Sequence, residues 1–266
     1  MIGLPTGRYT ARLAVTQEDL CQAQKLRYLA FHSGHDEVGH GEAGRGKSRE
    51  GQHPCPVNHD ADDFDALCQH VLIEDAQSGT LVCCFRLLSL AGGAEIGRSY
   101  SAQFYELSAL IAFPGPMIEL GRFCLHPDWH DPDILRLAWG VMTRLVDAGK
   151  VEMLFGCSSF RGTETAIYHE AFAMLRERHL APKRWLPRVK APDVFRFAQK
   201  LHRRKPDAVA AMRMMPPLLR TYLLMGGWVS DHAVVDQDMN TLHVFTGLEI
   251  RAIPQARARL LRQMAG

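Results

Sequence analysis

The chain has 266 residues, of which 47% are hydrophobic and 23% charged, and its 31 Lys and Arg against 29 Asp and Glu leave a formal net charge of +2. These values describe an ordinary globular chain, long enough to bury a sizeable core. No apolar run reaches the roughly 18 residues that a membrane span needs, and the start of the chain, MIGLPTGRYTARLAV, lacks the basic and apolar regions of an export signal. We therefore expect a cytoplasmic protein.

Strands and helices are expected to alternate in the middle of the chain, after an antiparallel hairpin. Thr16 is followed three residues later by Asp19, which marks the start of a helix. Residues 33–58 are rich in Gly, His and charge, and we expect a mobile loop of the kind that serves as a lid or a binding segment. In chain order the pattern predicts a strand over 9–15, a helix over 17–32, a hairpin over 70–88 around Asp75–Gly79, a short helix over 101–113, a strand over 117–125, a helix over 134–148, a strand over 151–155, helices over 164–178 and 216–224, and a strand over 242–250.

This order of elements predicts an α/β fold, in which helices flank a mixed sheet. We expect one domain over residues 1–266, with 33–58 as a loop insertion. Seven cysteines without CxxC spacing indicate reduced thiols better than disulfides or a zinc site.

Several charged residues interrupt apolar segments. Lone charges in apolar strands are costly to bury unless they pair with an opposite charge or bind a ligand. A substrate-binding site and a structural ion-pair network would use the same residues, so both readings stay open. The set comprises Arg27, Asp60, Asp62, Asp65, Arg86, Glu119 and Arg122.

Glu119 and Arg122 are three residues apart and would face opposite ways on a regular strand. A bulge would change this parity and expose backbone N–H groups. A carboxylate there could take a proton from an ammonium nucleophile, directly or through water, while the N–H groups stabilise the oxyanion of a thioester carbonyl. Glu119 is therefore the candidate catalytic base for amide-forming acyl transfer.

The segment FGCSSFRGT, residues 155–163, follows a buried run. Ser158 and Ser159 could line a slot for a pantetheine arm or help a leaving thiolate, or could simply complete local turn bonds. The G-x-S-x-G pattern of a nucleophile elbow is absent.

Two other patterns are weak. His126 and Asp131 have the H-x4-D spacing of glycerolipid O-acyltransferases, but no companion phosphate-binding motif accompanies them. DADDFD, residues 60–65, lacks the glycine and the bidentate acid of a calcium loop. We expect no metal site.

Residues 176–205 form a basic segment with only Glu177 and Asp193 as acidic residues. Such a segment favours an acidic partner, whether protein, nucleic acid or anionic lipid, or is a solvated helical face. Its basic residues are Arg176, Arg178, Lys183, Arg184, Arg188, Lys190, Arg196, Lys200, Arg203, Arg204 and Lys205.

The ordered set of Arg27, Phe31, DADDFD, Arg86 and ELGRF resembles the core of the acyl-homoserine-lactone autoinducer synthases, a branch of the GNAT superfamily. Longer motifs over roughly residues 8–255 resemble the bacterial ornithine lipid synthases, which transfer a 3-hydroxyacyl chain from acyl carrier protein to the α-amine of L-ornithine. They are HVLIED, RSYSAQFYEL, ELGRFCLHPDW, LAWG, LFGCSSFRGT, MPPLLRTYLLMGGWVSDHAVVDQDMNT and TGLEI.

The resemblance implies a GNAT-like fold with a mainly antiparallel central sheet, and Glu119 as the general base. It places the conserved charged positions on Arg27, Asp62, Asp65, Arg86 and Arg122. The Trp that the autoinducer synthases carry soon after Phe31 is missing here, which disfavours S-adenosylmethionine and favours an amino-acid acceptor.

The corner at residues 126–133 has no glycine to cradle a coenzyme A diphosphate, which fits a donor carried on the phosphopantetheine of acyl carrier protein, with no other cofactor. Lys183, Arg184, Arg188 and Lys190 are the expected carrier-docking residues. The basic segment, or Arg257, Arg259 and Arg262, could instead touch an anionic inner membrane face; no nucleic acid partner is expected. Alternatives are another acceptor (glutamine, lysine or glycine), autoinducer-like N-acylation, and a catalytically idle module that binds carrier protein or membrane.

Overall fold

The computed structural model describes residues 4–32 and 58–264. The chain divides into two compact units. Unit 1 comprises Met1–Leu88, Leu120–Gly149 and Ala258–Gly266, and unit 2 comprises Ser89–Glu119 and Lys150–Arg257. The boundary therefore runs through one strand, between Glu119 and Leu120. Most of the predicted loop 33–58 lies outside the described residues.

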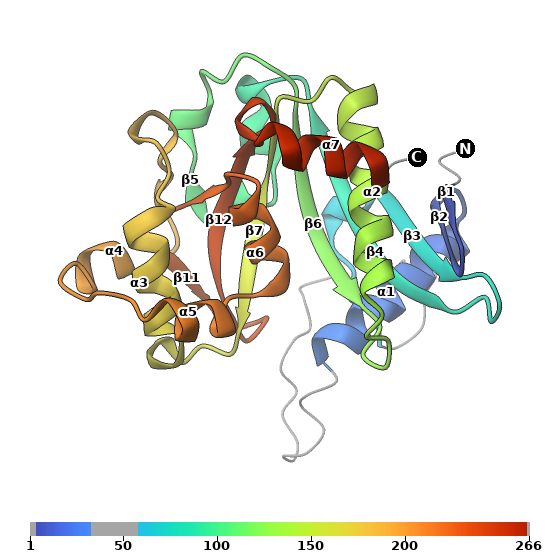
Figure 1. Ribbon diagram of the computed structural model, residues 1–266, viewed down its shortest axis with the longest axis horizontal. Helices are drawn as coiled ribbons and strands as arrows, with labels where there is room; N and C mark the ends of the chain where they lie inside the picture. The colour runs from blue at the N-terminus through green and yellow to red at the C-terminus, as the bar shows by residue number, and fades with distance from the viewer. Residues whose placement is uncertain (1–3, 33–57, 265–266) are drawn as a thin grey trace. The chain divides into compact units, whose positions relative to one another are not determined.

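Unit 1 is built on strands in the order β1-β2-β3-β4-β6 (Figure 1). The pairs β1–β2, β2–β3 and β3–β4 are antiparallel. Its elements are β1 (Leu4–Thr6), β2 (Tyr9–Leu13), α1 (Gln17–His32), η1 (Asp63–Ala66), β3 (Gln69–Asp75), β4 (Leu81–Leu90), β6 (Met117–Leu125) and α2 (Pro132–Ala148), where η denotes a 3-10 helix.

Local signals in the sequence explain where α1 and the hairpin form. The Thr16 hydroxyl accepts a hydrogen bond from the Asp19 N–H, while the Asp19 carboxylate accepts from the N–H groups of Val15 and Thr16, and this reciprocal cap begins α1 as predicted. Between β3 and β4, Gly79 has φ +71°, a conformation that favours glycine, so the predicted hairpin is confirmed.

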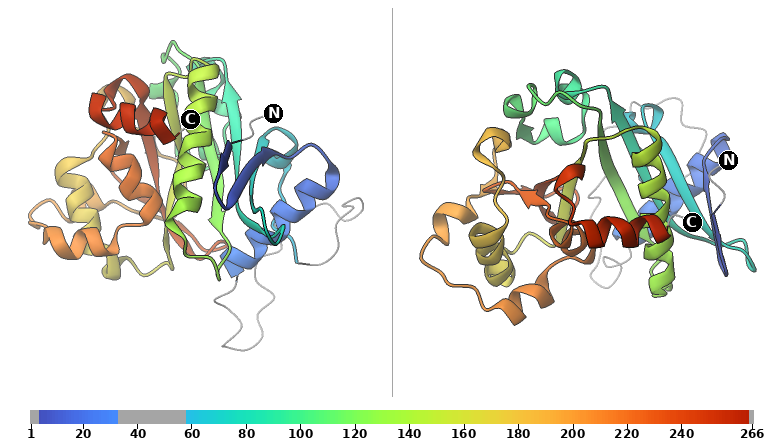
Figure 2. Two further views of the ribbon diagram at one scale, coloured as in Figure 1. Left: turned by 45° about the vertical axis from the view of Figure 1, so that its right-hand side comes forward. Right: turned by 45° about the horizontal axis from the view of Figure 1, so that its top comes forward.

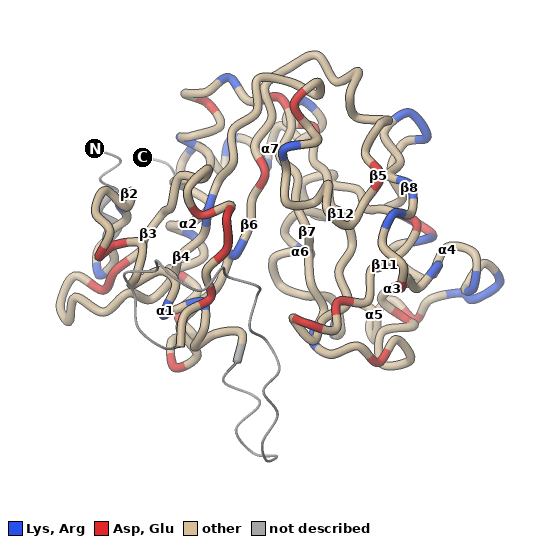
Figure 3. Tube along the Cα trace, turned by 180° about the vertical axis from the view of Figure 1, so that it is seen from behind, with Lys and Arg blue, Asp and Glu red and all other residues tan. Residues whose placement is uncertain are grey.

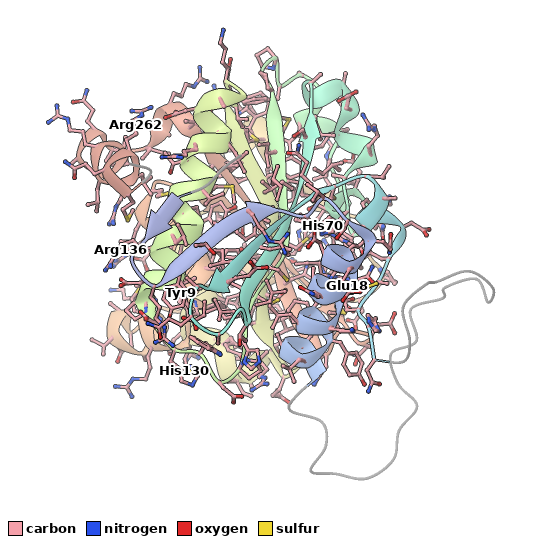
Figure 4. All side chains as sticks on the ribbon, turned by 90° about the vertical axis from the view of Figure 1, so that its right-hand side faces the viewer. Tyr9, Glu18, His70, His130, Arg136 and Arg262 are labelled. Carbon is pink, nitrogen blue, oxygen red and sulfur yellow. The ribbon has the colours of Figure 1, made fainter. Side chains whose placement is uncertain are left out.

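Helices α1 and α2 cover opposite faces of the unit 1 strands (Figures 1 and 4). Ala23 and Leu26 of α1 pack against Leu72, Cys84 and Cys124. Helix α2 contacts β2 and β1. Burying these apolar faces is what fixes the strands that carry Arg86 and Arg122.

Unit 2 continues from the first half of β6 in the order β6-β7-β12-β11-β9, with β10 paired to β12. Strands β6 and β7 are parallel over three pairs, ending at Glu119↔Phe155, whereas β7 and β12 are antiparallel over nine. Its further elements are η2 (Gly93–Arg98), η3 (Ser101–Gln103), β5 (Tyr105–Glu106), η4 (Ser108–Leu110), β7 (Met153–Arg161), η5 (Thr165–Tyr168), α3 (His169–Arg178), η6 (Lys183–Trp185), β8 (Arg188–Val189), β9 (Val194–Phe195), α4 (Phe197–Lys200), α5 (Ala208–Met214), α6 (Pro217–Leu224), β10 (Trp228–Val229), β11 (Ala233–Asp236), β12 (Thr241–Glu249), η7 (Ile250–Ala252) and α7 (Gln255–Met264), whose end lies in unit 1.

Helices α3 to α6 pack along one face of the unit 2 strands (Figure 2). Phe160, Leu242 and Val244 belong to this core together with Phe172 and Leu219 of the helices. On β7 and β12 the residues in between, among them Phe155 and Phe245, therefore face the other side. Glu119, the register partner of Phe155, belongs to that second face.

The predicted fold class is confirmed: helices flank a mixed, mainly antiparallel sheet. The single helix predicted over 101–113 is wrong, because β5 pairs with β8 and the Glu106 carboxylate binds the Ser108 N–H, which uses backbone groups that a helix would need. The strand predicted over 151–155 starts at Met153 and extends to Arg161, since β12 supplies partners for its polar end.

Two further findings concern membrane spans and cysteines. Within residues 4–32 and 58–264, no helix is long and apolar enough to cross a bilayer. Cys68, Cys83, Cys84, Cys124 and Cys157 are free, but Cys21 is disulfide-bonded, which corrects the expectation that all cysteines are reduced.

Candidate active site

In unit 1 the structure brings together the charged residues that the sequence singled out. Arg27 of α1, only 1% exposed, donates from Nη1 and Nη2 to both Asp65 oxygens at 2.8 and 2.6 Å. Arg86 of β4 donates to Asp65 Oδ1 at 2.7 Å and to Asp62 Oδ2 at 2.8 Å. Arg122 of β6 lies 3.2 Å from Asp62 Oδ2, and 3.0 Å from Asp60.

The positive charges of the arginines in this network compensate the negative charges of its aspartates. Burial alone would raise the pKa of Asp65, but the hydrogen bond and charge of Arg27, with the charge of Arg86, outweigh burial and lower that pKa well below its ordinary value. Three arginines face three aspartates, an arrangement that a structural ion-pair network also adopts. A substrate-binding role for these residues stays a prediction.

Two further members of this network went unnoticed in the sequence. Gln24 Nε2 donates to Asp65 Oδ2 at 2.9 Å, and His70 Nε2 lies 3.0 Å from the Asp65 carbonyl oxygen. Burial lowers the pKa of His70. Gln24 precedes Arg27 by three residues on α1, and this helical spacing was the available signal.

Strand β6 is irregular at Arg122, the second of its two charged residues. Arg122 has φ +51°, a left-handed conformation that is rare outside glycine and occurs at one type of β-bulge. The sequence predicted such an irregularity from the three-residue spacing of Glu119 and Arg122. Arg122 joins the unit 1 network, and Glu119 is held within unit 2.

Glu119 is 4% exposed, and hydrogen bonds from a nearby turn compensate its burial. Its Oε2 accepts from the Tyr100 N–H at 2.8 Å. Its Oε1 accepts from the Ser101 N–H at 2.8 Å and from the Ser101 hydroxyl at 2.5 Å. These three donors explain how a carboxylate is tolerated inside an apolar strand, because an unpaired buried charge would be far more costly.

Tyr100, Ser101 and Cys157 also contribute to the surroundings of Glu119, and no sequence pattern predicted them. Cys157 of β7 is partly exposed, and its Sγ lies 3.5 Å from the Ser101 Oγ. Ser101 lies in the stretch RSYSAQFYEL, and a serine at the start of a turn commonly supplies a hydroxyl donor. A regular helix was predicted over 101–113, so this signal was not used.

Ser158 and Ser159 lie within β7, and not in a loop after it, which corrects that part of the prediction. Ser158 is buried and accepts a hydrogen bond from the Thr246 hydroxyl at 2.9 Å. Ser159 is exposed and is the register partner of His243. Since neighbouring residues of a strand face opposite sides, these serines cannot line one slot together, and only Ser159 shares a face with Cys157.

A buried polar cluster lies on the same face as Cys157. The Tyr105 hydroxyl donates to the His243 carbonyl at 2.8 Å and lies 3.1 Å from His243 Nδ1. Burial, with a contribution from His232, lowers the pKa of His243 to about 4, so this ring is neutral at neutral pH. The sequence carried no pattern that singled out this cluster.

The H-x4-D pair does not form a dyad. Asp131 caps α2, where Oδ1 accepts from the Asp133 N–H and Oδ2 from the Tyr9 hydroxyl, both at 2.9 Å. Figure 4 shows Tyr9 beside the corner that carries His130. His126 bonds instead to the Asp128 N–H at 3.3 Å. Both oxygens of Asp131 therefore have partners other than His126, one at the start of α2 and one on β2.

The four predicted docking residues are all exposed in unit 2, and Figure 3 shows the basic stretch around β8 and α4. Arg184 lies 3.4 Å from Glu249, and Arg188 lies 3.9 Å from Glu106. Lys190 Nζ donates to the Ala102 carbonyl at 2.6 Å. Lys183, the fourth predicted docking residue, is the first residue of η6. Because β8 pairs with β5, this basic strand lies next to the turn that holds Glu119.

In DADDFD the carboxylates of Asp60, Asp62 and Asp65 bind arginines. In the described part of the chain, no group of three or more His, Cys, Asp or Glu residues is placed to hold a metal ion.

The mixed sheet and its flanking helices are those of the GNAT class of acyltransferases, and residues 42–140 match the family model described as an acetyltransferase (GNAT) domain. Within this class, the chain belongs to the family of L-ornithine N(alpha)-acyltransferases. It is 32% identical over 256 residues to the L-ornithine N(alpha)-acyltransferase of Rhodobacter capsulatus, covering 93% of this chain and 92% of that one. It is 27% identical over 254 residues to the Brucella abortus protein of the same name, and this match covers 93% of this chain and 86% of that one.

Among solved structures, the chain is similar to FeeM, an N-acyl amino acid synthase from uncultured soil microbes, with 10% identity, a TM-score of 0.47, and coverage of 97% of this chain and 98% of that chain. The family that the sequence motifs predicted is thus confirmed by the curated relatives.

Proposed function

We propose that this acyltransferase transfers a 3-hydroxyacyl chain from acyl carrier protein to the α-amine of L-ornithine and so forms lyso-ornithine lipid. The observation that carries the proposal is the match to relatives named L-ornithine N(alpha)-acyltransferase along 93% of the chain. The buried, hydrogen-bonded carboxylate of Glu119 supplies the chemical group that amide formation requires.

The chemistry begins with the α-ammonium group, which must lose a proton before its nitrogen can attack. Glu119 accepts this proton, directly or through water. The amine then attacks the thioester carbonyl, the C–N bond forms, the C–S bond breaks, and the carrier thiol leaves with a proton.

The ornithine carboxylate suits an arginine, since guanidinium and carboxylate form two parallel hydrogen bonds. The side chain of Arg122 is 13% exposed, against 1% for Arg27 and 3% for Arg86. Arg122 is therefore the member of the network best placed to exchange Asp60 or Asp62 for a substrate carboxylate.

Charge and the nature of the product support the proposed donor and the proposed location. The glycine-free corner at residues 126–133 fits a donor that lacks a nucleotide diphosphate. Carrier proteins are acidic, and the basic residues of η6 and β8 offer a complementary surface. The product carries a long acyl chain, so we propose a cytoplasmic enzyme whose basic segments also touch the anionic inner membrane face.

The test is an assay of the purified protein with 3-hydroxyacyl–carrier protein, the same acyl chain on coenzyme A, and a panel of ornithine, glutamine, lysine and glycine. Product is detected by mass. We expect the N-acylated ornithine from the carrier-bound donor at the highest kcat/KM. Preference for another amino acid overturns the acceptor, preference for coenzyme A overturns the donor, and no product with any pair favours a module that only binds.

Carrier docking predicts a charge effect. Reversing Lys183 and Arg188 together to Glu is expected to raise the KM for acyl carrier protein by about tenfold and leave kcat unchanged, because rim charges act mainly on encounter. The variant should use a free acyl-pantetheine thioester normally. Reversing Lys25 of α1 and Lys150 of the turn after α2, both of which are exposed, is the charge-matched control. Equal effects of the two double reversals would contradict docking at this surface.

A further inference from the structure

We propose that Ser101 is a positioning residue, which fixes the Glu119 carboxylate in the orientation that accepts the substrate proton. This inference rests on the proposed role of Glu119 as base. It assigns a function to a side chain that the sequence patterns did not single out.

The geometry singles out the Ser101 side chain. Ser101 is fully buried, and it binds one carboxylate oxygen, Oε1, through both its N–H at 2.8 Å and its hydroxyl at 2.5 Å. The Tyr100 N–H binds the other oxygen at 2.8 Å. A glutamate side chain can rotate about several bonds. Hydrogen-bond donors on both oxygens therefore hold the plane of the Glu119 carboxylate in one orientation.

The turn that carries these donors is itself anchored on both sides. Before it, the Ser99 hydroxyl donates to the Ile96 carbonyl at 2.7 Å and accepts from the Ala102 N–H at 3.2 Å. After it, the Ala191 N–H donates to the Phe104 carbonyl at 3.0 Å, and Lys190 binds the Ala102 carbonyl. A group held by a rigid scaffold keeps its geometry within fractions of an ångström, which is what proton transfer needs.

The Ser101 hydroxyl also bridges two strands. Its Oγ lies 2.5 Å from Glu119 of β6 and 3.5 Å from the Cys157 Sγ of β7. A serine hydroxyl has one proton to donate and two lone pairs to accept with, so it can serve the carboxylate and contact the thiol at once. Removing the hydroxyl takes away this side-chain donor and leaves the backbone donors of Tyr100 and Ser101 in place.

The first experiment replaces Ser101 with Ala. We expect kcat to fall by about 10- to 100-fold, because a misplaced catalytic group loses rate while ground-state binding is kept. The KM for ornithine should stay within about twofold, since Ser101 acts through Glu119 and does not bind the substrate. Ser101→Cys, which keeps the size of the side chain and a weaker donor, should restore part of kcat. A normal kcat in Ser101→Ala overturns the proposal.

A matched control removes a different buried serine from the same unit. Ser230 is fully buried, donates to the His232 carbonyl at 2.7 Å and accepts from the Phe245 N–H at 3.1 Å. Ser230→Ala should lower the temperature of unfolding and keep kcat. If it lowers kcat as much as Ser101→Ala does, the effect is one of general stability and the positioning role is overturned.

The second experiment places Ser101→Ala in the background of Glu119→Gln. If Ser101 acts only through the carboxylate, the double variant should have the kcat of Glu119→Gln within about twofold. Losses that multiply in the double variant overturn the proposal. The single variant Glu119→Gln tests the base separately, so failure of the proposed function is distinguishable from failure of this inference.

Discussion

Glu119→Gln is expected to lower kcat by roughly 10²–10⁴-fold, the range that a general base contributes. Glutamine keeps the size of the side chain but cannot take up a proton at neutral pH. The KM for the carrier-bound donor should change little. The measurement is steady-state kinetics with mass detection of the acylated amino acid.

The same substitution also disturbs the turn that holds Glu119. One end of the glutamine amide carries hydrogens, and these would face either the Tyr100 N–H or the two donors of Ser101. We therefore expect a loss of about 1–3 kcal/mol in the free energy of unfolding, and assays must be run well below the unfolding temperature. Glu106→Gln, a change on the neighbouring β5, is the matched control and should keep kcat. Near-normal turnover in Glu119→Gln would reject the base.

Arg27→Met is expected to lower the free energy of unfolding by about 3–5 kcal/mol, because it leaves Asp65 charged and buried without its main partner. Chemical denaturation at neutral pH measures this loss. Arg136→Met removes an arginine from an exposed ion pair with Asp133, so it is expected to have an effect of no more than about 1 kcal/mol. Comparable losses in the two variants would show that the buried network adds little stability.

The contribution of Asp65 depends on pH in a direction that its environment determines. Arg27 and Arg86 hold the pKa of this carboxyl below that of the unfolded chain, despite its burial. The stabilisation is therefore complete above about pH 4 and is lost as the pH falls further, when the unfolded chain binds the proton first. In Arg27→Met this acid sensitivity should weaken.

Much of the fold followed from local patterns. The reciprocal cap of Thr16 and Asp19, the turn at Gly79 and the apolar spacing of α2 were all readable, since each depends on residues close in sequence. The buried charges of Arg27, Arg86 and Glu119 could also be singled out, because a charge within an apolar run requires a partner.

The residues that pair with these buried charges were harder to predict from the sequence. The sequence could not decide between an ion-pair network and a ligand site, because both use the same side chains, and the contacts of Arg27 and Arg86 became clear only from their geometry. Ser101 was not predicted because its contact with Glu119 occurs where the β5–β8 pairing replaces a predicted helix with short turns. Such pairing between distant segments leaves no local pattern.

The course of β6 has a consequence for the variation that this chain can accept. Glu119 and Arg122 have separate sets of partners; Leu120 and Gly121 link them, and Arg122 itself has the irregular φ. Adding or deleting a single residue there would reverse the side to which one of the charges points. A change in chain length at this point would therefore turn either the Glu119 carboxylate or the Arg122 guanidinium away from its partners, so relatives that share this fold are expected to show no gaps there.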